Sequence, residues 1–332
     1  MELKARFQGC LLGGAIGDAL GYPVEFFDEE RIRKRYGDGG IRRFSNKTKV
    51  AFVSDDTQMT LFTAEGLLLA KKRGETLKDS IYLSYLDWLK TQTEKFSDEG
   101  EGLMAIPALY DDRAPGMTCL GALNSGIMGG ITSPINYSKG CGGVMRTSPV
   151  ALYCYARGAS IEGADELAAE AAAITHGHTL GHLPSYALNH IIYKLLEGEE
   201  LERAVEAAVK ATEERYIHDK SADLGISKIK KALSLGLDPA VTDKEAIAIL
   251  GEGWVAEEAL AVAVYCAVAH KDSFEEGVCA AVNHKGDSDS TGAITGNILG
   301  AYLGIDSIPD FYKNGVELRD TIFDIADRLL GK

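Results

Sequence analysis

Two segments of this chain carry a glycine at every fourth position, and this spacing restricts the possible folds more than any other feature. Both segments are otherwise apolar and are predicted to be helices. Glycine weakens a helix, so a row of glycines on one face indicates the close approach of another helix or of a ligand. Tight packing is the favoured interpretation of the first row. The glycines are Gly9, Gly13 and Gly17 within residues 6–20, and Gly292, Gly296 and Gly300 within residues 291–303.

Apolar residues recur with a helical period along most of the remaining chain, whereas convincing strands are nearly absent. The predicted class is therefore all-α. Residues 37–53 are polar and irregular, and only 50–53 alternate as an extended segment does. No low-complexity linker divides the 332 residues, so one domain over 1–332 is predicted. Further helices are expected over residues 56–73, 77–95, 120–130, 144–155, 162–174, 184–196, 201–216, 222–235, 256–269, 274–283 and 316–330.

The composition excludes several functional classes. A net charge of -14 argues against a protein that binds nucleic acid through its phosphates, and against binding to anionic membranes. No apolar stretch approaches the length of a transmembrane helix, and no signal-peptide pattern begins the chain. The six cysteines form no C-x-x-C pair and mostly lie in apolar stretches, which predicts buried thiols in a reducing compartment and no zinc site. We therefore expect a cytoplasmic, soluble protein.

Two short acidic clusters lie far apart in the sequence, each at the edge of an apolar run. Asp or Ser before a helix is also typical of an N-cap, and each cluster taken alone fits that simpler explanation better. A cap needs one oxygen, however, and each cluster contains two carboxylates. Adjacent like charges are unfavourable unless water or a cation screens them, and oxygen-only ligands suit Mg²⁺ or Mn²⁺. The favoured interpretation is one divided metal site, formed by Ser54-Asp55-Asp56-Thr57 and Asp287-Ser288-Asp289-Ser290-Thr291.

Asp18 and Glu25 follow one another closely around the end of the first glycine-rich helix. Asp18 lies inside an apolar segment, and a hydrogen-bonded structural carboxylate is its favoured interpretation. Glu25 follows a Gly-Tyr-Pro turn that could direct it into a cleft, and here the structural and functional interpretations stay balanced.

A glycine loop, Gly140-Cys141-Gly142-Gly143, precedes a predicted helix and offers backbone N–H groups to a phosphate. It lacks the Lys and Ser/Thr of a P-loop, so no nucleoside triphosphatase is implied. A nucleophilic role for Cys141 is disfavoured because no base is assigned to it. Arg146, just after the loop, is either a phosphate ligand or an internal ion-pair partner.

Three histidines lie between two predicted helices, at positions 176, 178 and 182. Such a group could bind zinc, stack on a purine or hydrogen-bond a carbonyl. Zinc is the least favoured option because no Cys or Glu completes a tetrahedral set. One histidine is expected to line a ligand cleft, and His284, beside the last acidic cluster, is expected to support a metal ligand from behind.

Taken together, these motifs resemble the ADP-ribosylglycohydrolase family, which includes the dinitrogenase reductase-activating glycohydrolase and the ADP-ribosylarginine hydrolases. No single motif is specific, but together they span nearly the whole chain in the family's order. They are Gly-Ala-Ile-Gly-Asp-Ala-Leu-Gly at 14–21 with Glu25, Ser-Asp-Asp-Thr at 54–57, Gly-Cys-Gly-Gly-Val-Met-Arg at 140–146, Thr175-His176, and Gly-Asp-Ser-Asp-Ser-Thr at 286–291.

The resemblance implies a compact, orthogonal helical bundle with two Mg²⁺ or Mn²⁺ ions at the base of a cleft. The implied reaction is hydrolysis of the bond between ADP-ribose and an acceptor on a protein, with arginine favoured over serine. Glu25, Asp55 and Asp289 are the implied catalytic residues, and a monomer is expected. The implied metal ligands are Ser54, Asp55, Asp56, Asp287, Asp289 and Ser290; the implied substrate-binding residues are Gly140, Cys141, Gly142, Gly143 and His176.

Departures from the family pattern leave the acceptor open. Cys141 replaces the Asn that is frequent in the family, and Lys139 stands where some relatives carry an aromatic residue and is expected to contact phosphate. The alternative to an enzyme is an ADP-ribose-binding or structural relative that lacks catalysis. Catalysis is favoured because buried carboxylates without their metals would be destabilising. A metal-dependent hydrolase of another sugar–nitrogen or phosphoester bond is the third hypothesis.

Overall fold

The computed structural model describes residues 2–44 and 50–331, and the regular structure of this part is helical. Three isolated β-bridges are the only extended pairings within it, which confirms the all-α prediction. Residues 45–49 of the predicted irregular segment lie outside the described residues. The α-helices are α1 (Leu3–Gly21), α2 (Glu29–Tyr36), α3 (Asp55–Arg73), α4 (Leu77–Thr93), α5 (Met117–Asn124), α6 (Ser148–Ala156), α7 (Ile161–Ala173), α8 (Thr179–Glu197), α9 (Leu201–Arg215), α10 (Asp223–Gly236), α11 (Asp243–Leu250), α12 (Ala256–Ala269), α13 (Phe274–Val282), α14 (Ser288–Leu303), α15 (Asp310–Lys313) and α16 (Arg319–Leu330). The 3₁₀ turns are η1 (Tyr22–Val24), η2 (Gly102–Ala105), η3 (Pro107–Tyr110), η4 (Cys141–Arg146), η5 (Lys220–Ala222) and η6 (Ile305–Ser307).

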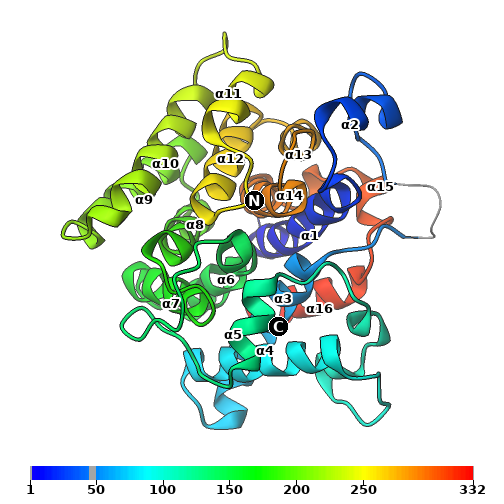
Figure 1. Cartoon of the computed structure of the whole chain (residues 1–332), viewed down its shortest axis with the longest axis vertical. Coiled ribbons are helices and arrows are strands. Elements are labelled where there is room, and N and C mark those ends of the chain that lie inside the picture. Colours follow the sequence, from blue (N-terminus) through cyan, green and yellow to red (C-terminus); the bar gives the residue numbers. More distant parts are fainter. Residues whose placement is uncertain (1, 45–49, 332) are drawn as a thin grey trace.

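The two glycine rows face each other. Helices α1 and α14 lie side by side in the middle of the molecule and run antiparallel (Figure 1). A Cβ added at Gly17 would lie 2.0 Å from the carbonyl oxygen of Gly292, and one added at Gly9 would lie 2.3 Å from that of Gly300. Only glycine permits this approach, so the predicted tight packing is confirmed. The pairing brings the C-terminal end of α1 to the N-terminal end of α14.

Buried apolar side chains connect this central pair to the surrounding helices. The cluster includes Ile16 of α1, Leu188 of α8, Val262 of α12 and Ile298 of α14. Most of the burial is in helices whose residues are apolar on several faces, as expected for helices surrounded by others. The prediction of one domain over 1–332 stays a prediction.

Proline explains two differences from the predicted helix boundaries. The segment predicted as one helix over 144–155 divides into η4 and α6, and Pro149 lies in the first turn of α6, where its missing N–H has no intrahelical partner to lose. In contrast, α8 begins five residues before the predicted start, at Thr179, and contains Pro184 in its interior. Helix α8 packs against α7 and α9, and this packing outweighs the loss of one backbone hydrogen bond.

Three short helices, α2, α11 and α15, were not predicted. Helix α2 is highly charged and buries only Ile32, so it has little apolar periodicity. Helix α11 has a capping box, in which Thr242 and Glu245 each accept a hydrogen bond from the other's backbone N–H. The helix predicted over 120–130 is shorter, because α5 ends before Gly126, which has a positive φ of 68°.

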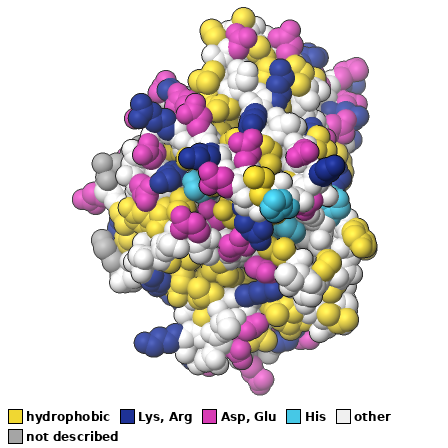
Figure 2. Space-filling model, turned by 90° about the vertical axis from the view of Figure 1, so that its left-hand side faces the viewer, with side chains coloured by type: hydrophobic (Ala, Val, Ile, Leu, Met, Phe, Trp, Pro, Cys, Tyr) yellow, Lys and Arg dark blue, Asp and Glu magenta, His cyan; other side chains and the backbone are white. Residues whose placement is uncertain are grey.

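Charged side chains of both signs are mixed on the visible surface (Figure 2). On the face shown in Figure 2, Lys and Arg side chains lie among Asp and Glu side chains, and no continuous basic surface is seen there. Among the helices of residues 2–44 and 50–331, none combines the length and the apolar character needed to cross a bilayer.

Candidate functional site

Asp18 connects the end of α1 to the start of α3. Its fully buried carboxylate accepts hydrogen bonds from the backbone N–H of Ser54, at 2.9 and 3.0 Å, and from that of Thr57, at 3.1 Å. It also accepts one from the Thr57 hydroxyl. Burial, and then the nearby charge of Asp289, raises the pKa of Asp18 to about 7. The structural role predicted for Asp18 is confirmed: it holds the first acidic cluster in place.

The first cluster forms the N-terminus of α3, but its carboxylates are not the cap. Ser54 is the N-cap, and its hydroxyl accepts a hydrogen bond from the Asp56 N–H at 3.2 Å. Asp55 accepts one at 3.0 Å from the N–H of Gly116, on a segment that no sequence pattern singled out. Asp56 is 3% exposed, and its Oδ1 has no hydrogen-bond partner among the described residues. The cap explanation therefore leaves both carboxylates available.

The second cluster begins α14, and here too no carboxylate caps the helix. Asp287 occupies the N-cap position without a side-chain cap hydrogen bond. Its backbone N–H donates to the carbonyl of Glu252 at 2.8 Å, and its Oδ2 accepts from the Cys141 thiol at 2.6 Å. Gly286 has a φ of 138°, and a Cβ there would lie 2.0 Å from the Glu252 oxygen, so the turn before the cluster requires glycine.

Glu25 completes the acidic cluster by approaching the second motif. One carboxylate oxygen from each of Glu25, Asp287 and Asp289 lies within 4.8 Å of the others. Glu25 is 8% exposed, and its Oε2 has no hydrogen-bond partner among the described residues. The family resemblance implied a catalytic role for Glu25. The structure also brings its carboxylate within reach of an ion that Asp287 and Asp289 could hold.

Electrostatics in this cluster favour a bound cation. Burial, followed by the charges of Asp289, Asp55 and Asp18, raises the pKa of Glu25 to about 9. Burial is also the main reason why the pKa values of Asp55, Asp56, Asp287 and Asp289 are raised. Of the ion pairs formed by the described residues, none involves these five acids.

The donor set fits divalent metal ions that prefer oxygen. Five carboxylates and the hydroxyls of Ser54 and Ser290 are buried together, and two carboxylate oxygens are orphaned, one on Glu25 and one on Asp56. Burying this many acids without compensation is unfavourable, and a hard cation would remove both the repulsion and the unmet hydrogen bonds. All six predicted ligands lie at the two helix N-termini; their coordination of an ion stays a prediction.

The glycine loop forms a wall next to the acidic cluster. Gly140 pairs with Val255 in an isolated bridge, and the loop continues into η4, a 3₁₀ turn where an α-helix was expected. The His176 ring packs against the loop: a Cβ added at Gly142 would lie 3.1 Å from it. Burial, and then the charge of Arg146, lowers the pKa of His176 to about 3, so the imidazole is neutral.

Two basic or polar side chains of this wall contact protein groups. Lys139 pairs with Glu257 at 2.5 Å, so contact with a phosphate would require it to move. The thiol of Cys141 donates to Asp287, which gives it a role in orienting a predicted metal ligand. Burial and the charge of Asp287 raise the pKa of Cys141, in agreement with the disfavoured nucleophile.

Arg146 fits neither of its two predicted roles. It is fully buried, and in the described structure it forms no ion pair. The guanidinium donates to the Thr175 hydroxyl at 2.7 Å and lies 4.2 Å from the centre of the Tyr85 ring. It also contacts two sulfur atoms, those of Met59 and Cys119, at 3.3 Å each. Arg146 therefore supports the wall from inside the core, which its position after a glycine loop did not reveal.

The other candidate histidines have structural partners. His178 caps α8, accepting from Leu180 N–H at 3.0 Å, and His182 lies within α8, 3.2 Å from the Tyr216 hydroxyl. His284 contacts the Thr291 hydroxyl at 3.0 Å and the carbonyl of its neighbour Lys285 at 3.1 Å. His284 thus stabilises the first turn of α14. Among the described residues, it forms no hydrogen bond to a carboxylate of the acidic cluster.

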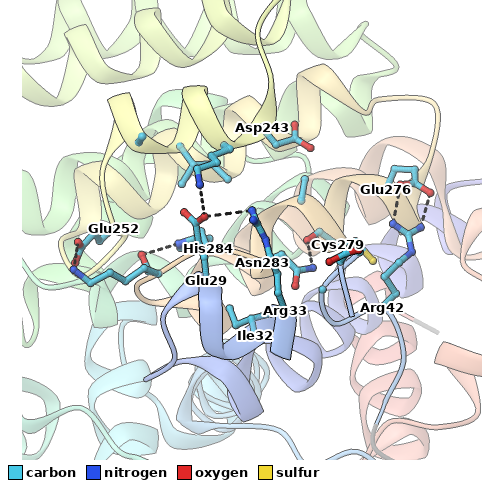
Figure 3. Close-up of a pocket in the computed structure, with 18 of the residues that line it drawn as sticks. Glu29, Ile32, Arg33, Arg42, Asp243, Glu252, Glu276, Cys279, Asn283 and His284 are labelled. Atoms are coloured by element: carbon cyan, nitrogen blue, oxygen red, sulfur yellow. Dashed lines mark hydrogen bonds and ion pairs between the residues drawn. The ribbon is translucent and has the colours of Figure 1, made fainter. Parts of the chain in front are cut away.

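A separate cavity of about 470 Å³ lies between α2, α11 and α13 (Figure 3). None of the five clustered carboxylates lines it, although Asn283 and His284 at its floor precede the second cluster. Its charged side chains contact one another: Glu29 lies 3.5 Å from Arg33 and 2.8 Å from Lys244. We regard it as an ion-paired groove beside the site. Of the buried side-chain atoms without a hydrogen-bond partner in the described structure, none belongs to a residue that lines it.

Comparisons with known proteins agree with this geometry. The family model described as ADP-ribosylglycohydrolase matches residues 1–332. The ADP-ribosyl-[dinitrogen reductase] glycohydrolase of Rhodospirillum rubrum is 27% identical, over 95% of this chain and 91% of that protein. An uncharacterized protein of Archaeoglobus fulgidus is also 27% identical, over 98% and 96%, and the human ADP-ribosylhydrolase ARH3 is 23% identical, over 94% and 89%.

A solved structure shares the fold. It is described as an ADP-ribosylglycohydrolase-related protein complex, and it aligns with a TM-score of 0.70 at 23% identity, covering 99% of this chain and 98% of its own. Together with the match of the family model over every residue, the fold and the acidic helix N-termini lead to one conclusion: the chain belongs to the ADP-ribosylglycohydrolase family.

Proposed function

We propose that this protein hydrolyses the glycosidic bond between ADP-ribose and an acceptor side chain of a protein, with arginine favoured and serine the second choice. The observation that carries the proposal is the group of five buried carboxylates, drawn from three segments, with no ion-pair partner among the described residues. Family membership supplies the reaction class, since relatives are named for acting on ADP-ribosyl groups. We expect the protein to act as a monomer in the cytoplasm.

Two Mg²⁺ or Mn²⁺ ions are the proposed cofactors. The residues that would hold them are Ser54, Asp55, Asp56, Asp287, Asp289 and Ser290. Bound there, the ions would orient the ribose hydroxyls and promote the loss of a proton from water. Cys141 would keep Asp287 in one orientation, because its thiol donates to Oδ2.

The reaction breaks the bond from the ribose C1 to the acceptor atom and forms a bond from C1 to the oxygen of water. The water gives up a proton and the leaving acceptor takes one, while positive charge builds on the sugar ring. We assign the movement of this proton, or the positioning of the water, to Glu25, whose Oε2 has no other described partner. Asp55 and Asp289 are assigned to the support of the attacking water, and their negative charges stabilise the ring as it becomes positive.

The glycine wall is the proposed binding surface for the diphosphate. The N–H groups of Cys141, Gly142 and Gly143 lie in η4, and backbone N–H groups in a turn suit an anion. The Gly140 N–H donates to the Ser138 hydroxyl at 3.3 Å and would have to leave it to bind the diphosphate. Lys139 would add a positive charge after leaving Glu257. The neutral His176 ring packs behind the glycine loop, where it limits the movement of the loop and adds no charge to the binding surface.

The test compares the protein with the double variant Asp55→Asn plus Asp289→Asn. Release of ADP-ribose is measured from arginine- and serine-linked ADP-ribosyl proteins, with Mg²⁺, with Mn²⁺ and with EDTA. Asp320→Asn is a matched control, since its carboxylate is 93% exposed. We expect metal-dependent release that the double variant loses and the control keeps. Binding of ADP-ribose without any release would instead favour the non-catalytic relative.

Thermal unfolding gives a readout that does not depend on activity. In EDTA the double variant should be at least as stable as the wild type, because two of the repelling carboxylates are gone. With saturating Mg²⁺ or Mn²⁺ the order should reverse, because ion binding stabilises only the native wild-type site. A wild type that gains no stability from either ion would refute the metal assignment.

A further inference from the structure

Two aromatic side chains stack on each other at the surface. The rings of Phe26 and Trp254 have centroids 5.8 Å apart and are inclined by 22°. They stay 70% and 40% exposed. Trp88, the other tryptophan, is fully buried. Exposed aromatic pairs leave much apolar area in water, so a ligand that covers them is a reasonable expectation.

The pair joins two walls of the candidate site. Phe26 directly follows Glu25. Trp254 lies between Gly253 and Val255: a Cβ added at Gly253 would be 3.4 Å from Cβ of Asp287, and Val255 pairs with Gly140 of the glycine loop. The stack thus connects the segment of Glu25 to the segment that separates Asp287 from the glycine loop.

The segment that carries Trp254 is held on both sides. The carbonyl of Glu252 accepts from the N–H of Asp287 at 2.8 Å, and the Glu252 carboxylate pairs with Lys285 at 3.0 Å. Figure 3 labels Glu252 among the residues that line the ion-paired groove. The N–H of Ala256 donates to the carbonyl of Lys139 at 2.9 Å. Hydrogen bonds to residues of the candidate site therefore hold the backbone on both sides of Trp254. A ligand that contacts Trp254 would lose little conformational entropy of this segment on binding.

In the described part of the chain, the ring faces of this pair carry no cation of the protein itself. Arg31 lies 3.7 Å from the centre of the neighbouring Phe27 ring, but within residues 2–44 and 50–331 no Arg or Lys lies over Phe26 or Trp254. Glu25, the residue before Phe26, has a carboxylate oxygen without a partner in the described structure. An aromatic face next to a carboxylate matches a planar cation, which stacks through its face and donates N–H groups from its edge.

We propose that the Phe26–Trp254 stack recognises the guanidinium of an arginine acceptor. The inference rests on the proposed function and adds the acceptor class and the residues that select it. The guanidinium would lie on the exposed aromatic surface while its substituted nitrogen, which leaves the sugar, faces Glu25. A serine acceptor offers neither a planar group nor a charge, so it would gain little from the stack.

The kinetic test uses Trp254→Ala and Phe26→Ala with arginine-linked and serine-linked ADP-ribosyl peptides. We expect KM for the arginine-linked peptide to rise about ten-fold. We expect kcat for it to stay within about two-fold, because the stack binds ground state and transition state alike. For the serine-linked peptide KM should change by less than about two-fold.

Leu237→Ala is the matched control for loss of an exposed apolar side chain. Leu237 is 53% exposed and follows Gly236, which packs on Val268 near the C-terminal end of α12, whereas Trp254 precedes the N-terminal end of that helix. Equal losses on both peptides would overturn the proposal and place the stack under the nucleotide. No change on either peptide would also overturn it. A wild type that releases nothing from the arginine-linked peptide would instead refute the proposed function.

Fluorescence supplies a binding readout without catalysis. With Trp88 buried, titration of the metal-loaded protein plus ADP-ribose with arginine amide should quench the emission of Trp254. Citrulline amide, which is planar but uncharged, should bind at least about five-fold more weakly. Trp254→Phe should abolish the signal, and Phe26→Ala should weaken the binding. Equal quenching by the two amides, or no quenching by either, would show that no cation is recognised.

Discussion

Replacing Gly17 by alanine tests the close contact between α1 and α14. The new methyl carbon would lie 2.0 Å from the carbonyl oxygen of Gly292 and 2.3 Å from its carbonyl carbon. Ordinary contact begins at 3.4 Å, so α1 and α14 must separate by about 1.4 Å at this point. The obstacle is backbone, and no side chain can rotate to make room for the methyl group.

The expected loss of stability follows from two opposing effects. Overpacking of this kind costs about 3 kcal/mol, the upper end of the usual range, because the backbone must yield. Alanine returns about 1 kcal/mol through its higher helix propensity. The net loss is about 2 kcal/mol, which for 332 residues lowers Tm by about 3 °C.

The assay is urea and thermal unfolding followed by helical circular dichroism. Gly121→Ala in α5 is the matched control, because a Cβ there meets nothing within 4 Å, and it should leave stability unchanged or slightly higher. Gly292→Ala would place its methyl group in the same contact, from the α14 side. In the double variant with Gly17→Ala, the total loss of stability should be smaller than the sum of the two single losses, because helices that are already separated accept the second methyl group more easily.

Metal binding by Gly17→Ala should weaken as well. The contact lies one turn from Asp289 in α14 and beside Asp18 in α1, so separation of the helices moves the two acidic clusters apart. If Gly17→Ala unfolds within about 0.5 kcal/mol of the wild type, the reasoning about the glycine contact is wrong.

Two further predictions concern charged groups away from the acidic cluster. The hydrogen bond from His270 to Asp243, 2.9 Å long, raises the pKa of His270 against the opposing effect of burial. The stabilisation by this ion pair is complete below the pKa of His270 in the unfolded chain, and it is lost as pH rises through the pKa in the folded protein. His270→Gln should therefore lower the free energy of unfolding, measured by urea titration, by about 0.5–1 kcal/mol more at pH 5.5 than at pH 8.5. A loss that does not depend on pH would contradict the ion pair. Arg146→Lys should lower the free energy of unfolding by about 3 kcal/mol or more, because a compact ammonium cannot keep both the hydrogen bond to Thr175 and the contact with Tyr85. Arg146→Met buries no charge and should lose less stability. The reverse order in urea unfolding would contradict our account of this buried cation.

Sequence patterns predicted helices best where apolar residues surround them. Helix α12 has the predicted bounds, because it is apolar on all sides and follows a turn rich in glycine. Helix α2 was missed since one buried residue, Ile32, gives no period to detect. The start of α8 was placed too late because Pro184 resembles a helix start, and only packing against other helices allows it inside.

The site was predicted in its parts rather than in its assembly. Asp18 needed a partner by the rule that buried carboxylates are hydrogen-bonded, and the structure provides Ser54 and Thr57. The contact between Cys141 and Asp287 could not be predicted, because no local pattern relates two residues that far apart. Trp254 was also missed. Its proposed role depends on its exposure and on its stacking with Phe26 of another segment, and a sequence pattern reveals neither.

The pairing of α1 with α14 has a consequence for how the protein is made. The side chain of Asn297 donates to the carbonyl of Cys10, a contact between residues 287 positions apart. The central helix of the fold therefore lacks its partner until nearly the whole chain has left the ribosome. At some 5–20 residues per second, α1 and its row of glycines wait on the order of tens of seconds for α14. During this time the acids of α3 stay hydrated and cannot form the metal site. Activity should therefore appear only after synthesis reaches the last helices, and chaperones that shield the apolar flanks of α1 would act on this interval.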